Sequence, residues 1–224
     1  MNWIYLSHIL SETTPLYGGM GQVKIVRARS MSEGDSSNSS DLALSAHAGT
    51  HVDAPRHFDP AGVTLDTYPP NHWQAVRPWL LDVSSPPGGI LDLTRIGAAL
   101  ETVPTECDML LLRTGAEAWR THDPKVYAEQ GPGVAPDVAD WLRRNRELKF
   151  LCMDFISVSS FAHREIGREA HQVFLGPHGV GSPPILLVED MALSQLEQAP
   201  RLVWIVPLRY TAADGAPVTV LAQV

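Results

Sequence analysis

Three histidines and one aspartate lie within a short segment of the sequence, at His47, His51, Asp53 and His57. Imidazole nitrogens and carboxylate oxygens are the usual protein ligands of Zn²⁺ and Mn²⁺. A single histidine is more often an ordinary core or surface residue, but four such side chains at this spacing are harder to attribute to chance. The cluster therefore predicts a divalent-metal site, in which Asp53 could bridge two ions.

A turn followed by an extended segment would bring these side chains together. Side chains alternate along a β-strand, so His51 and Asp53 would project from the same face. A glycine in the preceding turn permits the tight approach that brings His47 to the same point. Pro55 favours a break in the strand. We therefore expect His57 to lie beside the ion rather than to bind it.

A histidine next to a metal site is suited to proton transfer. The pKa of imidazole lies close to neutral pH, so His57 could serve as a general acid or base. A bound divalent ion lowers the pKa of water from 15.7 to about 7 and so supplies hydroxide at neutral pH. The cluster thus indicates hydrolytic chemistry.

Short apolar runs recur along the chain and are bounded by proline, glycine or aspartate, as buried strands are. An additional run, Gln22–Ala28, alternates apolar and polar side chains as a half-buried strand does. The buried runs are Trp79–Val83, Met109–Arg113, Lys149–Met153, Pro184–Val188, Leu202–Pro207 and Pro217–Gln223.

Helical periodicity is clearest over Ala135–Leu148, where a proline and an aspartate suit the first turn and arginines suit the last turns. Weaker helical patterns cover Leu93–Glu101 and Leu193–Ala199. Strands come first and then alternate with helices, which predicts an α/β fold with a mixed sheet. The polar segment Met31–Asp41 indicates an ordinary surface loop or a lid over a nearby site.

Composition narrows the class of protein. The chain has 224 residues, 44% of them hydrophobic, which suits a single domain over residues 1–224 with a sizeable core. A net charge of −8 without a basic cluster argues against nucleic-acid binding. No apolar run approaches the roughly 18–20 residues of a membrane span, and the N-terminus lacks signal-peptide features. We expect a cytoplasmic protein, with Cys107 and Cys152 as buried free thiols.

The histidine cluster belongs to a longer motif. Residues 47–58 read HAGTHVDAPRHF, which resembles the HxGTHxDxPxHF signature of the metal-dependent cyclase/hydrolase family. This family includes bacterial kynurenine formamidases and isatin hydrolases. Similar matches occur in Leu110–Thr114, around Met153 and Asp154, and in Asp214–Val218, so the resemblance covers most of the chain.

The resemblance implies a fold, an assembly and a set of site residues. The fold is a swivelling-type β/β/α domain with a mixed, barrel-like sheet flanked by helices. The assembly is a homodimer or homotetramer whose subunits contribute to each other's pockets. His57 would act as the proton shuttle and Tyr17 would line the substrate pocket. The implied metal ligands are His47, His51, Asp53, His171 and Glu189.

The chain departs from the family pattern in two places. The stretch Gly176–Pro184 is longer than its counterpart and carries His178. Either His171 keeps its role as a ligand or His178 replaces it, and the local context of His171 matches the family better. In addition, Gly18-Gly19-Met20 stands where the family has PGD, which alters the rim of the pocket.

Together these features predict a hydrolase that depends on one or two Zn²⁺ or Mn²⁺ ions per subunit. It would cleave the C–N bond of a small, aromatic amide, such as an arylformamide or a cyclic imide or lactam, by metal-bound hydroxide with His57 as general acid/base. Two alternatives need the same ligands: a metal-dependent cyclase or dehydratase of a small natural-product intermediate, and a non-catalytic metal- or ligand-binding protein. His57 disfavours the latter, because binding alone needs no free base.

Overall fold

A mixed β-sheet of nine strands forms the centre of the protein. The structure is a computed structural model that describes residues 2–176 and 182–224. The strands follow the order β5-β12-β13-β4-β11-β10-β8-β6, and β1 also pairs with β13. Their bounds are β1 (Trp3–Tyr5), β4 (His51–Asp53), β5 (Gln74–Ala75), β6 (Pro78–Asp82), β8 (Met109–Arg113), β10 (Phe150–Met153), β11 (Leu186–Glu189), β12 (Leu202–Pro207) and β13 (Gly215–Gln223).

The strands β6, β8, β10 and β11 form the parallel half of the sheet. In this half Leu151 lies opposite Leu110 on one side and Leu187 on the other, and all three side chains are fully buried. A strand that is covered on both faces has a continuous apolar sequence rather than an alternating one. Four of the six apolar runs predicted as buried strands therefore coincide with these strands, apart from a residue or two at their ends, and the other two coincide with β12 and with most of β13.

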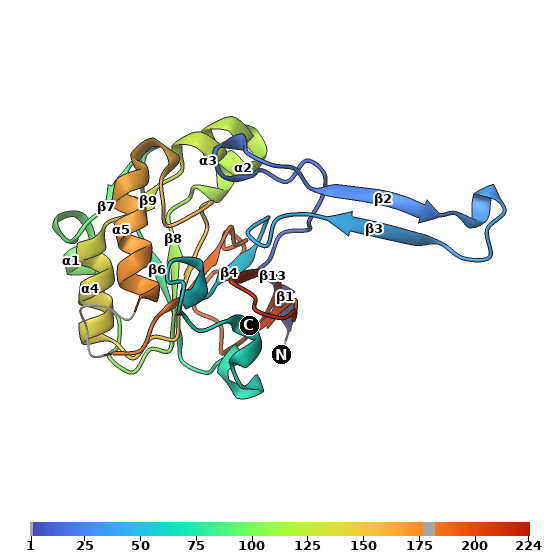
Figure 1. Ribbon diagram of the computed structural model, residues 1–224. Coiled ribbons are helices and arrows are strands. Elements are labelled where there is room, and N and C mark those ends of the chain that lie inside the picture. Colours follow the sequence, from blue (N-terminus) through green and yellow to red (C-terminus); the bar gives the residue numbers. More distant parts are fainter. Residues whose placement is uncertain (1, 177–181) are drawn as a thin grey trace.

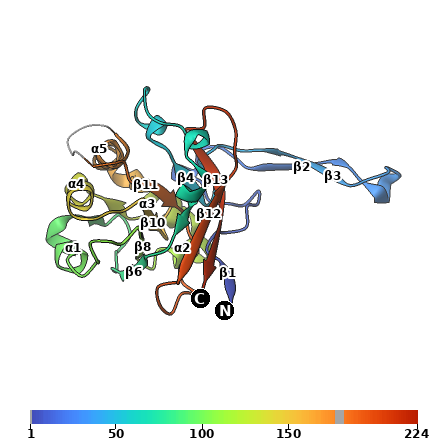
Figure 2. The same cartoon turned by 90° about the horizontal axis from the view of Figure 1, so that it is seen from below.

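The helices α1, α4 and α5 cover one face of the sheet, whereas α2 and α3 lie together at one end of it (Figures 1 and 2). The helices predicted at 135–148 and 93–101 are confirmed as α4 and α1. The short strands β7 (Ile90–Leu91) and β9 (Gly133–Val134) pair in parallel. The helix bounds are α1 (Leu93–Leu100), α2 (Glu117–His122), α3 (Pro124–Gln130), α4 (Pro136–Asn145) and α5 (Arg164–Leu175).

The helix predicted over Leu193–Ala199 is wrong. Leu193 and Leu196 are buried, which explains the helical spacing of the apolar residues, but the segment forms turns. Their backbone carbonyl groups accept hydrogen bonds from Arg113 Nη1 at 3.2 and 2.5 Å, and the amide of Ser194 donates to Glu117. Hydrogen bonds to distant side chains therefore satisfy this backbone in place of helical ones.

The strands β2 (Lys24–Arg29) and β3 (Ser39–Ala43) form an antiparallel hairpin that projects away from the rest of the protein (Figures 1 and 2). We call these two strands and the turn between them the arm. Every residue of both strands is exposed, so the half-buried strand predicted at Gln22–Ala28 is correct in type but not in burial. The predicted loop Met31–Asp41 forms the far turn and the start of β3, and it does not line the pocket described below.

The predicted α/β fold, with a mixed, barrel-like sheet and flanking helices, is confirmed. Its core lies between the sheet and the helices and contains both cysteines as free thiols, as predicted. Trp73 also packs in this core. Within residues 2–176 and 182–224, none of the helices has the length and hydrophobicity needed to cross a membrane.

Candidate metal centre

Strand β4 positions two of the predicted ligands. His51 and Asp53 project from the same face of this strand, and their atoms Nε2 and Oδ1 lie 3.4 Å apart. The chain enters β4 through a turn in which Gly49 adopts a φ of +65°, a conformation that side chains with a Cβ disfavour. This turn brings His47 Nδ1 to 2.7 Å from Asp53 Oδ1. The strand-and-turn geometry predicted from the spacing is therefore present.

Strand β11 and helix α5 supply the other two predicted ligands. Because β11 pairs antiparallel with β4, Glu189 lies opposite His51, and Glu189 Oε2 is 3.3 Å from His51 Nε2. Helix α5 directs His171 onto the same point, with its Nε2 atom 3.7 Å from Asp53 Oδ2 and 3.6 Å from Glu189 Oε1. The alternative ligand His178 lies outside the described residues.

Hydrogen bonds to the backbone orient two of the buried imidazoles. Nδ1 of His51 donates to the carbonyl oxygen of Gly49 at 2.8 Å, and Nδ1 of His171 donates to that of Gly167 at 2.7 Å. Each bond leaves Nε2 facing the carboxylates. Such a second hydrogen bond is the usual way in which proteins fix the tautomer and ring orientation of a metal-binding histidine.

The side of the site nearer to solvent holds His57 and Asp214. Strand β4 ends at Asp53, and a 3-10 turn over Pro55–His57 follows, which is the break that Pro55 predicts. The rings of His57 and His47 stack with their centroids 3.9 Å apart. Asp214 Oδ2 lies 3.1 Å from His47 Nε2 and 3.6 Å from His57 Nδ1.

Gly215 makes room for this arrangement at the start of β13. A Cβ atom at this position would lie only 2.4 Å from Cε1 of His47, closer than real Cβ contacts occur. Any other residue would displace the imidazole. The Asp214-Gly215 pair at the start of the last strand therefore supplies a carboxylate and leaves space for His47.

Opposite charges govern the titration of the site. Burial alone lowers the pKa of His171, but the carboxylates of Asp53 and Glu189 outweigh it and raise this pKa to about 10. Burial also lowers the pKa of His47, but the carboxylates of Asp53 and Asp214 outweigh this effect and raise the pKa to about 9. Despite burial, the surrounding histidines hold the pKa of Asp53 well below its usual range. The buried carboxylates are thus ionised and balanced by positive charge, which protonated histidines supply here and which a divalent cation could supply in their place.

The pKa of His57 shifts in the opposite direction, below its usual value. Burial lowers its pKa, and the nearby charges of His47 and His171 lower it further against the raising effect of Asp53. A neutral imidazole can accept a proton, whereas an imidazolium cannot. His57 is thus the member of the cluster whose surroundings favour the form that a general base needs.

The donor set fits a divalent cation. Ligand atoms of His51, Asp53 and Glu189 all lie within 4.8 Å of one another, and the same holds for His47, Asp53 and His57. Asp53 belongs to both groups, which is the arrangement that a bridging carboxylate requires. His57 lies within the second group, closer to the ligands than the break at Pro55 implies. Its role, like those of the other site residues, stays a prediction.

These residues lie in a pocket of about 400 Å³ with an aromatic wall. The ring of Phe58 stacks on His171 with centroids 4.4 Å apart. Tyr17, the predicted substrate-binding residue, lines the pocket and places its hydroxyl oxygen 3.1 Å from Oγ of Ser159. Its ring also meets Phe161 edge-on at 5.3 Å. Flat, apolar side chains therefore lie beside the charged centre.

The sequence interpretation missed several residues of the site. Asp214 begins the DGAPV segment that resembles the family, and this resemblance could have identified it. It was missed because it lies far from the histidines in sequence. Ser157 was not predicted to belong to the site, yet its hydroxyl donates to Glu189 Oε1 at 3.1 Å, and the amide of Val158 donates to the same oxygen at 2.7 Å. These two bonds hold the Glu189 carboxylate in place.

Comparison with known proteins agrees with the motif. Residues 4–160 match the family model for Cyclase, described as "Putative cyclase". Cyclase-like protein 2 of Oryza sativa subsp. japonica is 30% identical over 226 residues, a match that covers 95% of this chain and 76% of that protein. A kynurenine formamidase of Bacillus cereus is 27% identical over 221 residues, which cover 96% of this chain and 94% of that protein.

A solved structure shares the fold. Isatin hydrolase A from Labrenzia aggregata, bound to benzyl benzoate, superposes with a TM-score of 0.80 at 21% identity and covers 99% of this chain and 93% of its own. The superposition therefore covers nearly the whole chain. With the family match over most of its length, the chain belongs to the cyclase family.

Proposed function

We propose that this protein is a divalent-metal-dependent hydrolase that cleaves the C–N bond of a small, aromatic amide, such as an arylformamide or a cyclic imide or lactam. The observation that carries the proposal is the convergence of two buried carboxylates, Asp53 and Glu189, with four imidazoles at the floor of one pocket. Similarity to a kynurenine formamidase over nearly the full length of both chains supports the choice of bond.

The proposed metal ligands are the residues that meet at this floor, and they would hold one or two Zn²⁺ or Mn²⁺ ions. Imidazole and carboxylate donors suit both metals. When bound, a divalent ion activates water and polarises the carbonyl oxygen of an amide. The ligands proposed are His47, His51, Asp53, His171 and Glu189.

His57 is proposed to move the proton. Its Nδ1 atom faces the Asp214 carboxylate at 3.6 Å, which leaves Nε2 to exchange a proton with water and with the departing nitrogen. The surroundings that lower the pKa of His57 keep its ring neutral and able to accept the first proton. Asp214 then stabilises the imidazolium that forms, as a carboxylate partner does in other acid–base pairs.

The aromatic wall supports a flat substrate. Phe58, Tyr17 and Ile156 line the same pocket as the charged residues. A planar ring packed against such side chains gains both apolar burial and favourable ring contacts. An aryl amide would therefore place its ring against the wall and its C–N bond over the carboxylates.

The test is hydrolysis of N-formylkynurenine by protein stripped with a chelator and then supplied with Zn²⁺ or Mn²⁺. We expect no turnover without metal and release of formate with metal. The matched control is Asp41→Asn, which changes a carboxylate on the exposed strand β3 and should behave as wild type. A product that retains all the atoms of its substrate, or that has lost only water, would replace the hydrolase with a cyclase or dehydratase.

We further propose that the protein assembles as a homodimer or homotetramer. Both strands of the arm are exposed, and they present Ile25, Val26 and Leu42 to solvent, with Met31 in the turn. An isolated two-stranded hairpin is marginal in water, so burial against a second copy would stabilise it. Light scattering after gel filtration should give a multiple of the 24.5 kDa chain mass, and Leu42→Asp should lower it. A monomeric wild type would contradict the proposal.

A further inference from the structure

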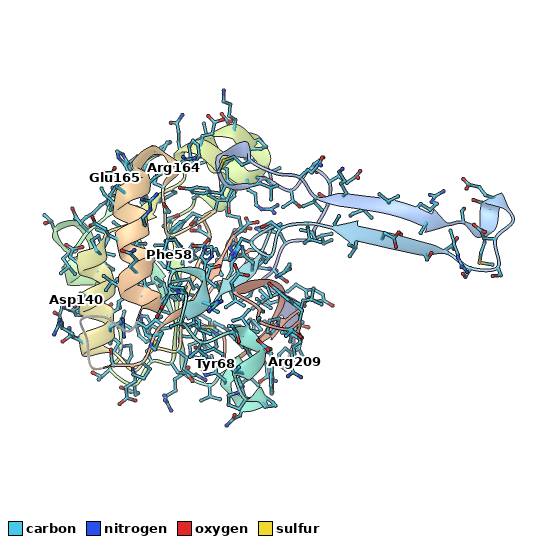
Figure 3. All side chains as sticks on the ribbon, viewed as in Figure 1. Phe58, Tyr68, Asp140, Arg164, Glu165 and Arg209 are labelled. Atoms are coloured by element: carbon cyan, nitrogen blue, oxygen red, sulfur yellow. The ribbon has the colours of Figure 1, made fainter. Side chains whose placement is uncertain are left out.

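One face of helix α5 carries two arginines above the metal centre. Arg164, Arg168 and His171 follow one another at intervals of four and three residues, and such residues lie on the same side of a helix. All three line the pocket. Figure 3 shows Arg164 at the end of α5 and Phe58 further down, beside the helix. These three residues form a stripe that runs from the metal centre to the N-terminal end of the helix.

Both arginines are exposed to solvent, and neither has a carboxylate partner among the described residues, whereas four other arginines do. Arg113, Arg120 and Arg144 pair with aspartates at 2.5 to 2.7 Å. In contrast, neither Arg164 nor Arg168 forms an ion pair within the described part of the chain. The guanidinium of Arg164 lies instead over the ring of Phe161, 3.8 Å from its centroid.

Acidic groups near the stripe do not neutralise it. Asp190 also lines the pocket, but Arg120 already binds both of its carboxylate oxygens, at 2.7 and 2.9 Å. Glu165 and Glu169 follow the two arginines by one residue, which turns them about 100° around the helix axis and out of the stripe. Glu169 lines a separate depression. The arginines thus form a cationic rim in a chain of net charge −8.

The rim lies at a defined distance from the reactive centre. At a rise of 1.5 Å per residue, the backbone of Arg168 is about 4.5 Å and that of Arg164 about 10 Å along the helix from His171. An anion held there would be separated from the metal centre by roughly the width of an aromatic ring with a short side chain. Arginine binds carboxylates through parallel hydrogen bonds, which fix orientation as well as charge.

We infer that Arg164 and Arg168 bind a carboxylate of the substrate, so that the preferred substrate is an acidic aryl amide rather than a neutral one. This inference rests on the proposed hydrolase function and narrows its substrate class. The carboxylate lies on the rim, the ring lies against Phe58, and the C–N bond lies over Asp53 and Glu189. The two arginines act as specificity-determining residues.

The test compares two formanilides that differ only in charge: 4-(2-formamidophenyl)-4-oxobutanoate and its carboxamide. For metal-loaded wild type, we expect kcat/KM for the acid to exceed that for the amide by roughly tenfold or more, mainly through KM. In the double variant Arg164→Met/Arg168→Met the ratio should fall to about one, and in Arg168→Lys it should fall only in part, because lysine keeps the charge. Arg29→Met, on the arm, is the matched control and should keep the wild-type ratio.

Calorimetry on chelator-treated protein gives a reading that is independent of turnover. The acid should bind wild type roughly tenfold more tightly than the amide, and high salt should reduce the difference. Equal kcat/KM for acid and amide in wild type, or a preference that survives the double variant, would overturn the inference and leave the hydrolase standing. Failure to hydrolyse either compound would overturn the hydrolysis of arylformamides, and equal binding of both would overturn the carboxylate site as well.

Discussion

The two sides of the metal centre differ in their exposure to solvent. His51, His171 and Glu189 have side chains that are only 3 to 5% exposed, whereas those of His47, His57 and Asp214 are 22 to 44% exposed. Asp53 is buried and touches both sides. A buried donor set holds a cation well because water cannot compete with its ligands, while proton exchange requires access to substrate and solvent. We therefore propose that the inner side binds the metal, together with Asp53 and His47 at the boundary between the two sides, and that His57 on the outer side transfers the proton.

Glu189→Gln should break the inner side and have the largest effect. The substitution keeps the shape of the side chain but removes a buried negative charge that faces His51 and His171. We expect loss of bound metal and a fall in kcat/KM of roughly 10³-fold. The assay is turnover with the metal content measured in the same sample. Glu169→Gln, an exposed position of α5, is the control, and wild-type turnover by Glu189→Gln would remove this residue from the centre.

His57→Gln should separate the two sides. Because the inner ligands remain, the variant should keep its metal, while the loss of the general acid/base should lower kcat by about 10²- to 10⁴-fold. Metal analysis together with the pH dependence of kcat provides the measurement. Loss of metal in this variant would place His57 among the ligands, and unchanged kcat would assign the proton transfer elsewhere.

Asp214→Asn should have a smaller effect on the outer side. The variant keeps a hydrogen-bonding oxygen but loses the charge that faces His47 and His57. Removing an outer partner of this kind usually costs about 10- to 100-fold in activity or metal affinity, and we expect the lower end because Asp214 is partly exposed. Steady-state kinetics at fixed metal concentration test this, and an effect as large as that of Glu189→Gln would contradict the division into two sides.

His72, which lies outside the metal centre, shows how burial changes the pKa of a histidine that has no carboxylate beside it among residues 2–176 and 182–224. His72 packs against Tyr68 and Phe150, with ring centroids 4.4 and 5.2 Å away. Burial, aided by the charge of Lys149, lowers its pKa to about 4, whereas the carboxylates beside His171 raise the pKa of that residue to about 10.

The lowered pKa of His72 predicts how stability depends on pH. Between pH 4 and 6.5 the unfolded chain binds a proton that the folded protein does not, so the stabilising contribution is complete above pH 6.5 and is lost as the pH falls towards 4. From pH 7 to pH 5 the loss should be about 1–2 kcal/mol. His72→Phe should reduce this loss in urea unfolding at the two pH values, and an unchanged slope would show that His72 does not titrate in this way.

Local rules were sufficient to predict one half of the site. The alternation of side chains along a strand places His51 and Asp53 on one face, and the glycine turn adds His47, so neighbours in sequence are neighbours in space. The parallel strands were equally predictable, because a strand covered on both faces has a continuous apolar sequence.

The remaining parts depend on contacts between distant segments. Asp214 reaches His47 only because β13 pairs antiparallel with β4. Helix α5 was not predicted, since its large buried apolar residues, Phe174 and Leu175, lie only in its last turn, and Gly167, Ala170 and His171 fill the rest of its buried face. The false helix at Leu193–Ala199 has the right apolar spacing, but Arg113 binds its carbonyl groups. No local pattern reports such long-range partners.

The most direct test of this account is the metal content of purified protein after dialysis against buffer without metal, in wild type and in Asp53→Asn. Asp53 is the carboxylate shared by both sides of the centre. The account predicts one or two tightly held Zn²⁺ or Mn²⁺ ions per chain in wild type and almost none in Asp53→Asn, with both proteins folded by circular dichroism. Equal metal content in the two proteins, or a wild type that binds neither ion when titrated, would contradict it.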